Sequence, residues 1–112
     1  VVLSNQHEVE EITADYSELI KLPLRGVIAT ASSQQYDFVS RFFAPKYGIP
    51  EDSVTGSAYT VLAPYWFEQL GKRELNARQI SPRGGNVRCK LLDNRVLITG
   101  SAVKYLDGEI NI

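Results

Sequence analysis

The sequence predicts an α+β fold in which a bent, mainly antiparallel sheet is wrapped around one central apolar helix. Three observations lead to this fold class. The run from Tyr59 to Leu70 is apolar almost all the way round a helix axis, and Gly71 ends it. Residues 87–91 alternate between apolar and polar side chains, as a half-buried strand does. Short apolar runs bounded by Gly, Pro and Asn lie on both sides of the helix and predict further strands.

Before the central helix, the sequence predicts one short helix and two strands. Asp15 is the candidate N-cap of a helix over residues 16–21, and Pro23 closes it. The β-branched run at 25–31 predicts a buried strand, and the alternation over 36–43 predicts a second strand with both faces partly covered. Loops are expected at residues 7–11 and, after Pro45 and Gly48, in the segment that leads to the central helix.

The central helix has room for about four turns between Gly56 and Leu70. Because apolar side chains surround its axis, most sides of this helix are expected to be covered by the rest of the chain. Pro64 removes the hydrogen bond to the carbonyl group of Thr60, so a kink is expected there.

After Gly71 the chain is expected to be all β. Val87, Cys89 and Leu91 share one face of the clearest strand, so the Cys89 side chain turns inward and is expected to be a core residue rather than a nucleophile. Asp93-Asn94 predicts a tight hairpin turn. The strands expected in this half cover residues 75–81, 87–91, 95–99 and 101–106.

Composition excludes several classes of protein. With 112 residues, of which 44% are hydrophobic and 22% charged, the chain is one ordinary soluble domain or part of one. The formal net charge is −1 with both signs interspersed, so neither a nucleic acid nor a membrane surface is an expected partner.

The chain shows no membrane-spanning stretch and no signal peptide, and a cytoplasmic location is expected. Cys89 and His7 are single residues of their types, which gives no disulfide and no metal cluster. Because Val1 is not methionine, the natural start is expected to lie upstream.

The start of the central helix carries the candidate chemistry. Asp52 and Thr55 are residue types that cap helices. The backbone N–H groups of Gly56, Ser57 and Ala58 are expected to be unpaired, and the helix dipole adds positive potential there. Such a helix start binds a carboxylate or a phosphate. A well-capped helix that binds nothing is the alternative that these local features leave open.

Several blocks of sequence follow one another in a fixed order: residues 40–45, 48–58, 65–66, 70–72 and 79–85. Together they resemble the PhzF-like family of phenazine-biosynthesis-type isomerases, relatives of diaminopimelate epimerase. The last block, Gln-x-Ser-x-Arg-Gly-Gly, is most similar to the animal phenazine biosynthesis-like domain proteins. The resemblance runs from about Arg25 to Ala102 and implies that residues 1–112 are the C-terminal lobe of a two-lobed fold with its active site in the cleft between the lobes.

The resemblance implies a cofactor-independent isomerase or epimerase that transfers a proton on a small carboxylate substrate. It implies that Asp52 is catalytic and that Thr55, Gly56 and Ser57 bind the substrate. The family's catalytic Glu and a substrate loop belong to an N-terminal lobe that residues 1–112 do not match, so this chain alone is expected to be inactive. A homodimer of the full-length protein is also implied, and no metal or other cofactor is needed.

Two interpretations of function stay open. The first is the C-terminal lobe of an isomerase, and the second is a non-catalytic binding or interaction module that retains the same lobe. Asp52 has a helix cap as its alternative role. Ser57 is not expected to be a covalent nucleophile, because no histidine base lies near it in the sequence. Arg41 and Arg83 are expected to be structural and to pair with Glu side chains or carbonyl groups.

Overall fold

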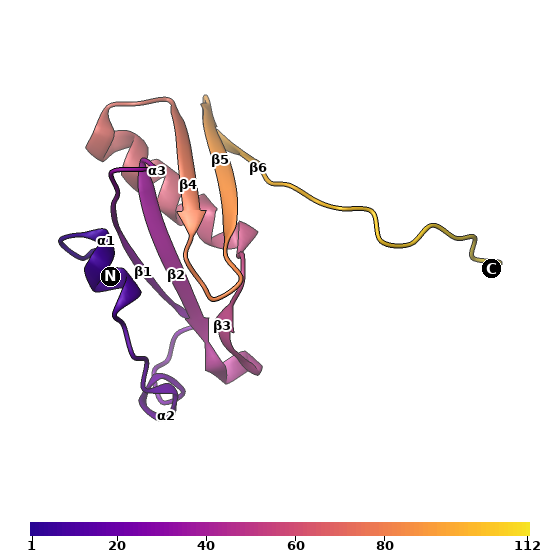
Figure 1. The fold of residues 1–112 in the computed structure, drawn as a ribbon, viewed down its shortest axis with the longest axis horizontal. Helices are drawn as coiled ribbons and strands as arrows, with labels where there is room; N and C mark the ends of the chain where they lie inside the picture. Colours follow the sequence, from indigo (N-terminus) through magenta and orange to yellow (C-terminus); the bar gives the residue numbers. More distant parts are fainter.

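The computed structural model describes residues 1–112 as one mixed sheet with a single long helix, α3, against one of its faces (Figure 1). A six-stranded sheet with one main helix confirms the predicted α+β class. Five strands lie where they were expected, and helix α3 packs on one face of the sheet with its other side toward solvent. The elements are α1 (Gln6–Glu10), α2 (Tyr16–Leu19), β1 (Val27–Ser32), β2 (Phe38–Ala44), η1 (Pro45–Tyr47), β3 (Ile49–Asp52), η2 (Gly56–Ala58), α3 (Tyr59–Leu70), β4 (Glu74–Gln79), β5 (Gly85–Leu92) and β6 (Arg95–Thr99).

Strand β2 organises the sheet, whose order is β1-β2-β4-β5-β6. Strand β1 runs antiparallel along one edge of β2. The other edge is shared: β4 pairs in parallel with its first half, where Ser40 faces Gln79, and β3 pairs antiparallel with its second half, where Phe42 faces Asp52. Ser40 and Phe42 point to the same face of the sheet, because side chains alternate along a strand. The register therefore brings Gln79 and Asp52 to one face, about 7 Å apart along β2.

Helix α3 packs on this face through a stripe with helical spacing. The buried side chains are those of Tyr59, Leu62, Ala63, Trp66 and Phe67, at positions i, i+3, i+4, i+7 and i+8. They form one core with Phe38, Leu75, Val87 and Cys89 of the sheet. The Trp66 ring stacks on the Phe38 ring with centroids 5.4 Å apart, and its indole N–H donates a hydrogen bond to the Thr30 hydroxyl at 3.0 Å.

The outer face of α3 differs from the expectation that most of the helix is covered. The sheet ends at β1 and β6 and covers one side only, so Val61 is 65% exposed and Tyr65 36% exposed. Pro64 lies on this exposed side, and α3 continues through it as one element. The α-helix begins at Tyr59 rather than at Gly56, because η2 forms its first turn. No helix of the chain is both long and apolar enough to cross a membrane.

Two short elements occur where loops were predicted. Asn5 caps α1 by accepting a hydrogen bond from the Glu8 amide at 3.0 Å, and Val9 is buried in a second core beneath β1 and β2. Val9 is the one apolar residue of this five-residue helix, and hydrogen bonds from Ser33 to Gln6 and from Arg41 to the Val9 and Glu10 carbonyls hold it as well. Strand β3 is the second such element, and it forms because the second half of β2 offers a free edge.

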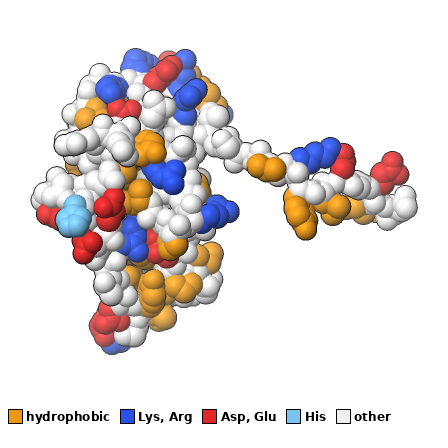
Figure 2. All heavy atoms as spheres, in the orientation of Figure 1, with side chains coloured by type: hydrophobic (Ala, Val, Ile, Leu, Met, Phe, Trp, Pro, Cys, Tyr) orange, Lys and Arg blue, Asp and Glu red, His pale blue; other side chains and the backbone are white.

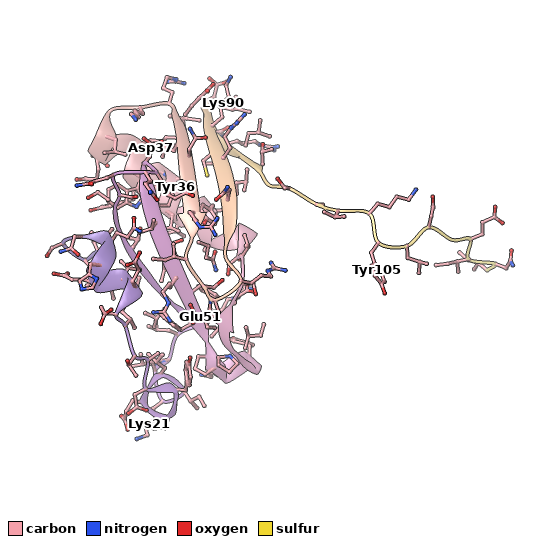
Figure 3. The ribbon with its side chains drawn as sticks, viewed as in Figure 1. Lys21, Tyr36, Asp37, Glu51, Lys90 and Tyr105 are labelled. Atoms are coloured by element: carbon pink, nitrogen blue, oxygen red, sulfur yellow. The ribbon has the colours of Figure 1, made fainter.

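The C-terminal segment corrects another prediction. Residues 101–106 were expected to form a strand, but the chain after Thr99 is extended, exposed and without regular structure, and it leads away from the sheet (Figures 1 and 2). Tyr105 projects from it without a neighbour and is 98% exposed (Figure 3). A strand requires an adjacent strand to satisfy its backbone, and no strand of residues 1–112 lies beside this segment. The predicted hairpin turn at Asp93-Asn94 is confirmed, since Leu92 pairs with Arg95 and Asp93 has φ 43°.

Cys89 is a core residue, as predicted, and its surroundings favour the neutral thiol. Burial raises the pKa of Cys89 to about 11 from its ordinary value of 9.0. Burial likewise raises the pKa of the Tyr59 phenol to about 12 from 10.0. Both side chains are fully buried, so neither is available as a nucleophile at neutral pH.

These two groups predict a loss of stability at alkaline pH. Above pH 9 the unfolded chain ionises Cys89, and above pH 10 it ionises Tyr59, while the folded protein keeps both neutral up to about 11 and 12. The unfolded state then binds fewer protons, so the free energy of unfolding falls as pH rises, on the order of 2 kcal/mol for each group. Chemical denaturation between about pH 8 and 12 measures this slope. A double variant, Cys89→Ala with Tyr59→Phe, is the control and should have a flatter profile; an identical slope would contradict the assignment.

Candidate active site

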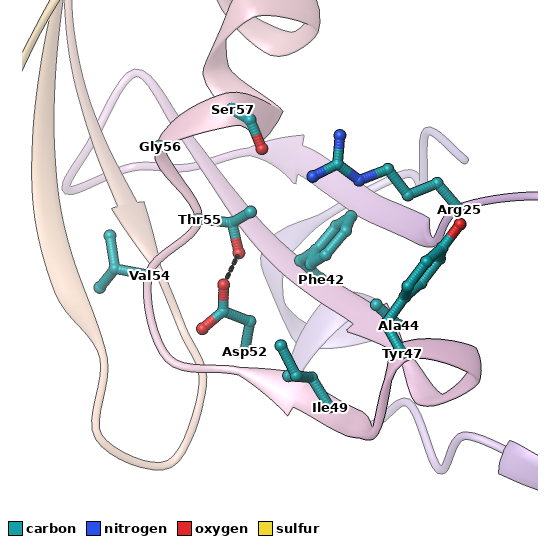
Figure 4. A pocket seen from close by; sticks show the side chains of 10 residues that line it. All are labelled: Arg25, Phe42, Ala44, Tyr47, Ile49, Asp52, Val54, Thr55, Gly56 and Ser57. Atoms are coloured by element: carbon teal, nitrogen blue, oxygen red, sulfur yellow. Dashed lines mark hydrogen bonds between the residues drawn. The ribbon is translucent and has the colours of Figure 1, made fainter.

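A pocket of about 550 Å3 opens beside η2, between the start of α3 and strand β3 (Figure 4). Its wall contains Arg25, Phe42, Ala44, Tyr47, Ile49, Asp52, Val54, Thr55, Gly56 and Ser57. All four of the site residues named from the sequence therefore meet in one pocket. Asp52, Thr55 and Ser57 follow one another along one side of it, and Arg25 and Tyr47 lie across from them. Strand β3 brings in Asp52, and the turn after it brings in the other three.

Two backbone N–H groups at the helix start are free. Those of Gly56 and Ser57 make no hydrogen bond within the protein, and both residues are exposed to the pocket. The Ala58 amide, expected to be free as well, donates to the Thr55 carbonyl at 3.1 Å because η2 is a 3-10 turn. The candidate anion cradle, the free N–H groups of Gly56 and Ser57, thus has two donors at the positive end of a helix, with the Ser57 side chain beside them.

Asp52 has a different local role from the expected helix cap. The N-cap of η2 is Thr55, whose side chain makes no capping bond, and that of α3 is Ala58. The Thr55 hydroxyl instead donates to the Asp52 Oδ2 atom at 2.6 Å. The Asp52 Oδ1 atom takes part in no hydrogen bond within the protein. One carboxylate oxygen is therefore held, and the other is available at the pocket.

Gln79 is a site residue that the sequence reasoning missed. It is completely buried at the end of β4, and its amide group makes three hydrogen bonds to the turn that carries the site. Its Oε1 atom accepts from the Thr55 N–H at 2.9 Å. Its Nε2 atom donates to the Asp52 carbonyl at 2.9 Å and to the Thr55 hydroxyl at 3.1 Å. The sequence does contain a signal for this residue, because Gln79 is the first residue of the Gln-x-Ser-x-Arg-Gly-Gly block. That block points to the family but not to a contact between Gln79 and Thr55.

The rest of that block fastens the same turn. The Ser81 hydroxyl donates to the Ser53 carbonyl at 2.8 Å and accepts from the Gly84 amide at 3.0 Å. A side chain at position 85 would place its Cβ atom 2.3 Å from Val54, so only Gly85 allows the β4–β5 connection to lie this close. The loop between β4 and β5 is therefore built as a support for residues 52–55.

The two arginines singled out from the sequence behave differently. Arg41 is structural, as expected: it binds both carboxylate oxygens of Glu51, at 2.7 and 2.9 Å, and donates to the carbonyl groups of Val9 and Ile12. The Glu51 hydrogen bond raises the pKa of the Arg41 guanidinium. Arg83 is exposed and makes no ion pair, which corrects the expected pairing. The cation that lines the pocket is Arg25, which the sequence reasoning treated only as the start of a strand.

The fold and the pocket together define a class of protein. A mixed six-stranded sheet with one long helix against it is the diaminopimelate epimerase-like fold, which the similar solved structures of PhzF-family proteins share. The chain belongs to the PhzC/PhzF family of phenazine biosynthesis-like proteins, because the pattern of that family matches residues 1–108. This confirms the resemblance read from the sequence blocks.

Individual relatives agree with this assignment. An uncharacterized isomerase of Pseudomonas aeruginosa is 45% identical over 112 residues, which cover 100% of this chain and 43% of the relative. A phenazine biosynthesis-like domain-containing protein of Bos taurus is 43% identical over 117 residues, covering 95% of this chain and 41% of the relative. The crystal structure of a Clostridium difficile protein described as phenazine biosynthesis PhzC/PhzF matches with a TM-score of 0.90 and 44% identity, covering 100% of this chain and 44% of that one. The chain thus spans less than half the length of these relatives.

Proposed function

We propose that residues 1–112 form the C-terminal lobe of a cofactor-independent isomerase that transfers a proton on a small carboxylate substrate. The observation that carries this proposal is the meeting, in one pocket, of the half-buried Asp52 carboxylate with the two free N–H groups of Gly56 and Ser57. The name of the Pseudomonas aeruginosa relative supports an isomerase. Membership of the family supports it as well.

Each part of the pocket has a role in this proposal. The amides of Gly56 and Ser57 hold the substrate carboxylate, and Arg25 adds positive charge across the pocket. Removal of a proton next to a carboxylate builds negative charge on its oxygens, and fixed donors placed there stabilise the transition state. Asp52 acts as the acid/base through its unbonded oxygen. Thr55 lines the pocket between them.

The second acid/base belongs, in this proposal, to an N-terminal lobe that closes the open side of the pocket. The relatives are more than twice as long as this chain, which leaves room for such a lobe. The full-length protein is proposed to form a homodimer. Analytical ultracentrifugation of the full-length protein tests this last point directly.

Deuterium exchange tests the proposed reaction. The full-length protein, incubated in deuterated water with candidate amino acids and dihydroanthranilate-type substrates, is expected to introduce deuterium into at least one of them, as read by NMR. Residues 1–112 alone are expected to introduce none, because the opposing acid/base is absent. Turnover by residues 1–112 alone would overturn the two-lobed site. A full-length protein that binds these carboxylates without exchange would favour the binding-module interpretation.

A further inference from the structure

We propose that Gln79 is a positioning residue that acts through Thr55: it directs the Thr55 hydroxyl proton onto Asp52 and so holds that carboxylate for proton transfer. The inference rests on the proposed function, since it concerns the same Asp52. It assigns to Gln79, and to the Thr55 hydroxyl that it orients, a role in positioning Asp52 that is separate from any contact with the substrate.

The orientation of the Gln79 amide is fixed by main-chain partners. The Thr55 N–H can only donate, and it faces Oε1 at 2.9 Å. The Asp52 carbonyl can only accept, and it faces Nε2 at 2.9 Å. Rotating the amide by half a turn would place two donors together and two acceptors together, at a completely buried site. The Nε2 atom must therefore be the one that approaches the Thr55 hydroxyl, at 3.1 Å.

This orientation decides where the Thr55 proton goes. The hydroxyl oxygen accepts from Gln79, so its single proton is left for another acceptor. Asp52 Oδ2 lies 2.6 Å away, a length typical of a hydroxyl bound to a carboxylate. Thr55 is only 8% exposed, which limits competition from water. The hydrogen bonds thus run in one direction, from Gln79 through Thr55 to Asp52.

The consequence for Asp52 is a carboxylate with two unequal oxygens. Oδ2 receives the Thr55 proton, and Oδ1 has no partner in the protein. A carboxylate held at one oxygen cannot rotate freely, so its other oxygen keeps one direction relative to the Gly56 and Ser57 amides. Orientation of this kind supports catalysis because a displacement of about 1 Å costs on the order of 100-fold in rate.

Three variants of the full-length protein test the proposal. Thr55→Val removes the hydroxyl at nearly constant shape and leaves the Thr55 N–H bond to Gln79 in place, and Thr55→Ser is the matched variant that keeps the hydroxyl. Gln79→Glu keeps the Oε1 atom that accepts from the Thr55 N–H, but it replaces the Nε2 donor with a second oxygen. That oxygen competes with Asp52 for the Thr55 hydroxyl proton. The rate of deuterium exchange is expected to fall about 100-fold in Thr55→Val and in Gln79→Glu. Thr55→Ser is expected to restore most of it.

Binding of acetate separates positioning from folding. Acetate is used as a bare carboxylate, and its titration is followed by the amide NMR signals of Gly56 and Ser57. The midpoint of that titration is expected to be unchanged in Thr55→Val, so that the loss falls on kcat and not on KM. A wild-type exchange rate in Thr55→Val overturns the proposal, and so does a loss that Thr55→Ser fails to restore.

The hydrogen-bond direction is also measurable without turnover. In the wild-type protein the Thr55 hydroxyl proton is expected to exchange slowly with water and to show a nuclear Overhauser effect to the Gln79 amide protons. If the wild-type protein catalyses no exchange of any substrate, the proposed function fails, yet this signal still decides the inference about Gln79. A rapidly exchanging Thr55 hydroxyl would overturn it.

Discussion

Asp52→Asn in the full-length protein is expected to abolish turnover while the fold and the binding of carboxylates persist. An amide cannot accept and return a proton at the substrate, and a positioned acid/base contributes about 10²- to 10⁴-fold to the rate. The amide oxygen can still accept the Thr55 hydroxyl, so the contact at Oδ2 is retained in a neutral form. The rate of deuterium exchange, the melting temperature and the acetate titration measure the three properties separately.

Glu51→Gln is the matched control for Asp52→Asn. Glu51 is the neighbouring carboxylate, but both of its oxygens are bound by Arg41, and it does not line the pocket. Its loss is therefore expected to lower stability and to leave turnover in place. Full turnover in Asp52→Asn would reduce Asp52 to a structural partner of Thr55. Equal losses of turnover in both variants would contradict a specific role of the Asp52 Oδ1 atom. They would show that turnover depends on the negative charge of this segment as a whole.

The sequence predicts those elements whose pattern is determined locally. Tyr59, Leu62 and Trp66 recur at helical spacing, and Val87 and Cys89 alternate with polar residues, so α3 and β5 were found. Strand β3 was missed because Ile49–Asp52 contains Pro50 and two carboxylates and shows no alternation. It exists because β2 has a free edge at that point, which is a property of the tertiary structure.

The C-terminal segment shows the opposite error. Val103 and Tyr105 are residue types that strands favour, yet they are 92% and 98% exposed. Residue type alone does not say whether a neighbouring strand is present. An exposed apolar segment of this kind is typical of a surface that another part of a protein covers.

The candidate site was predicted as far as its residues are adjacent in the chain. Asp52, Thr55, Gly56 and Ser57 lie within one short segment, and helix-start chemistry connects them. Gln79 is 24 residues from Thr55, and only the pairing of β3 and β4 with the same edge of β2 brings the two together. Arg25 reaches the pocket from the residues before β1 for the same kind of reason.

Gly56→Val is expected to block the anion cradle without unfolding the protein. A Cβ atom at Gly56 would meet no other atom within 4 Å, and the φ angle of Gly56 is not positive, so the backbone tolerates a side chain. The open space around that position is the pocket itself, where the oxygen of a bound carboxylate would lie. The branched side chain takes that place. The expected cost is about 3 kcal/mol of transition-state stabilisation, the scale on which one oxyanion donor acts.

Gly100→Val is the matched control for this substitution. Gly100 also has no atom within 4 Å of a built Cβ and no positive φ, but it lies outside the pocket. Both variants are expected to keep the wild-type melting temperature, because neither new side chain meets an atom of the protein. Only Gly56→Val is expected to lose deuterium exchange and the acetate titration of the Ser57 amide. If acetate binds equally well to both variants, the carboxylate lies elsewhere in the pocket, and Arg25, on its opposite side, becomes the group to which it binds.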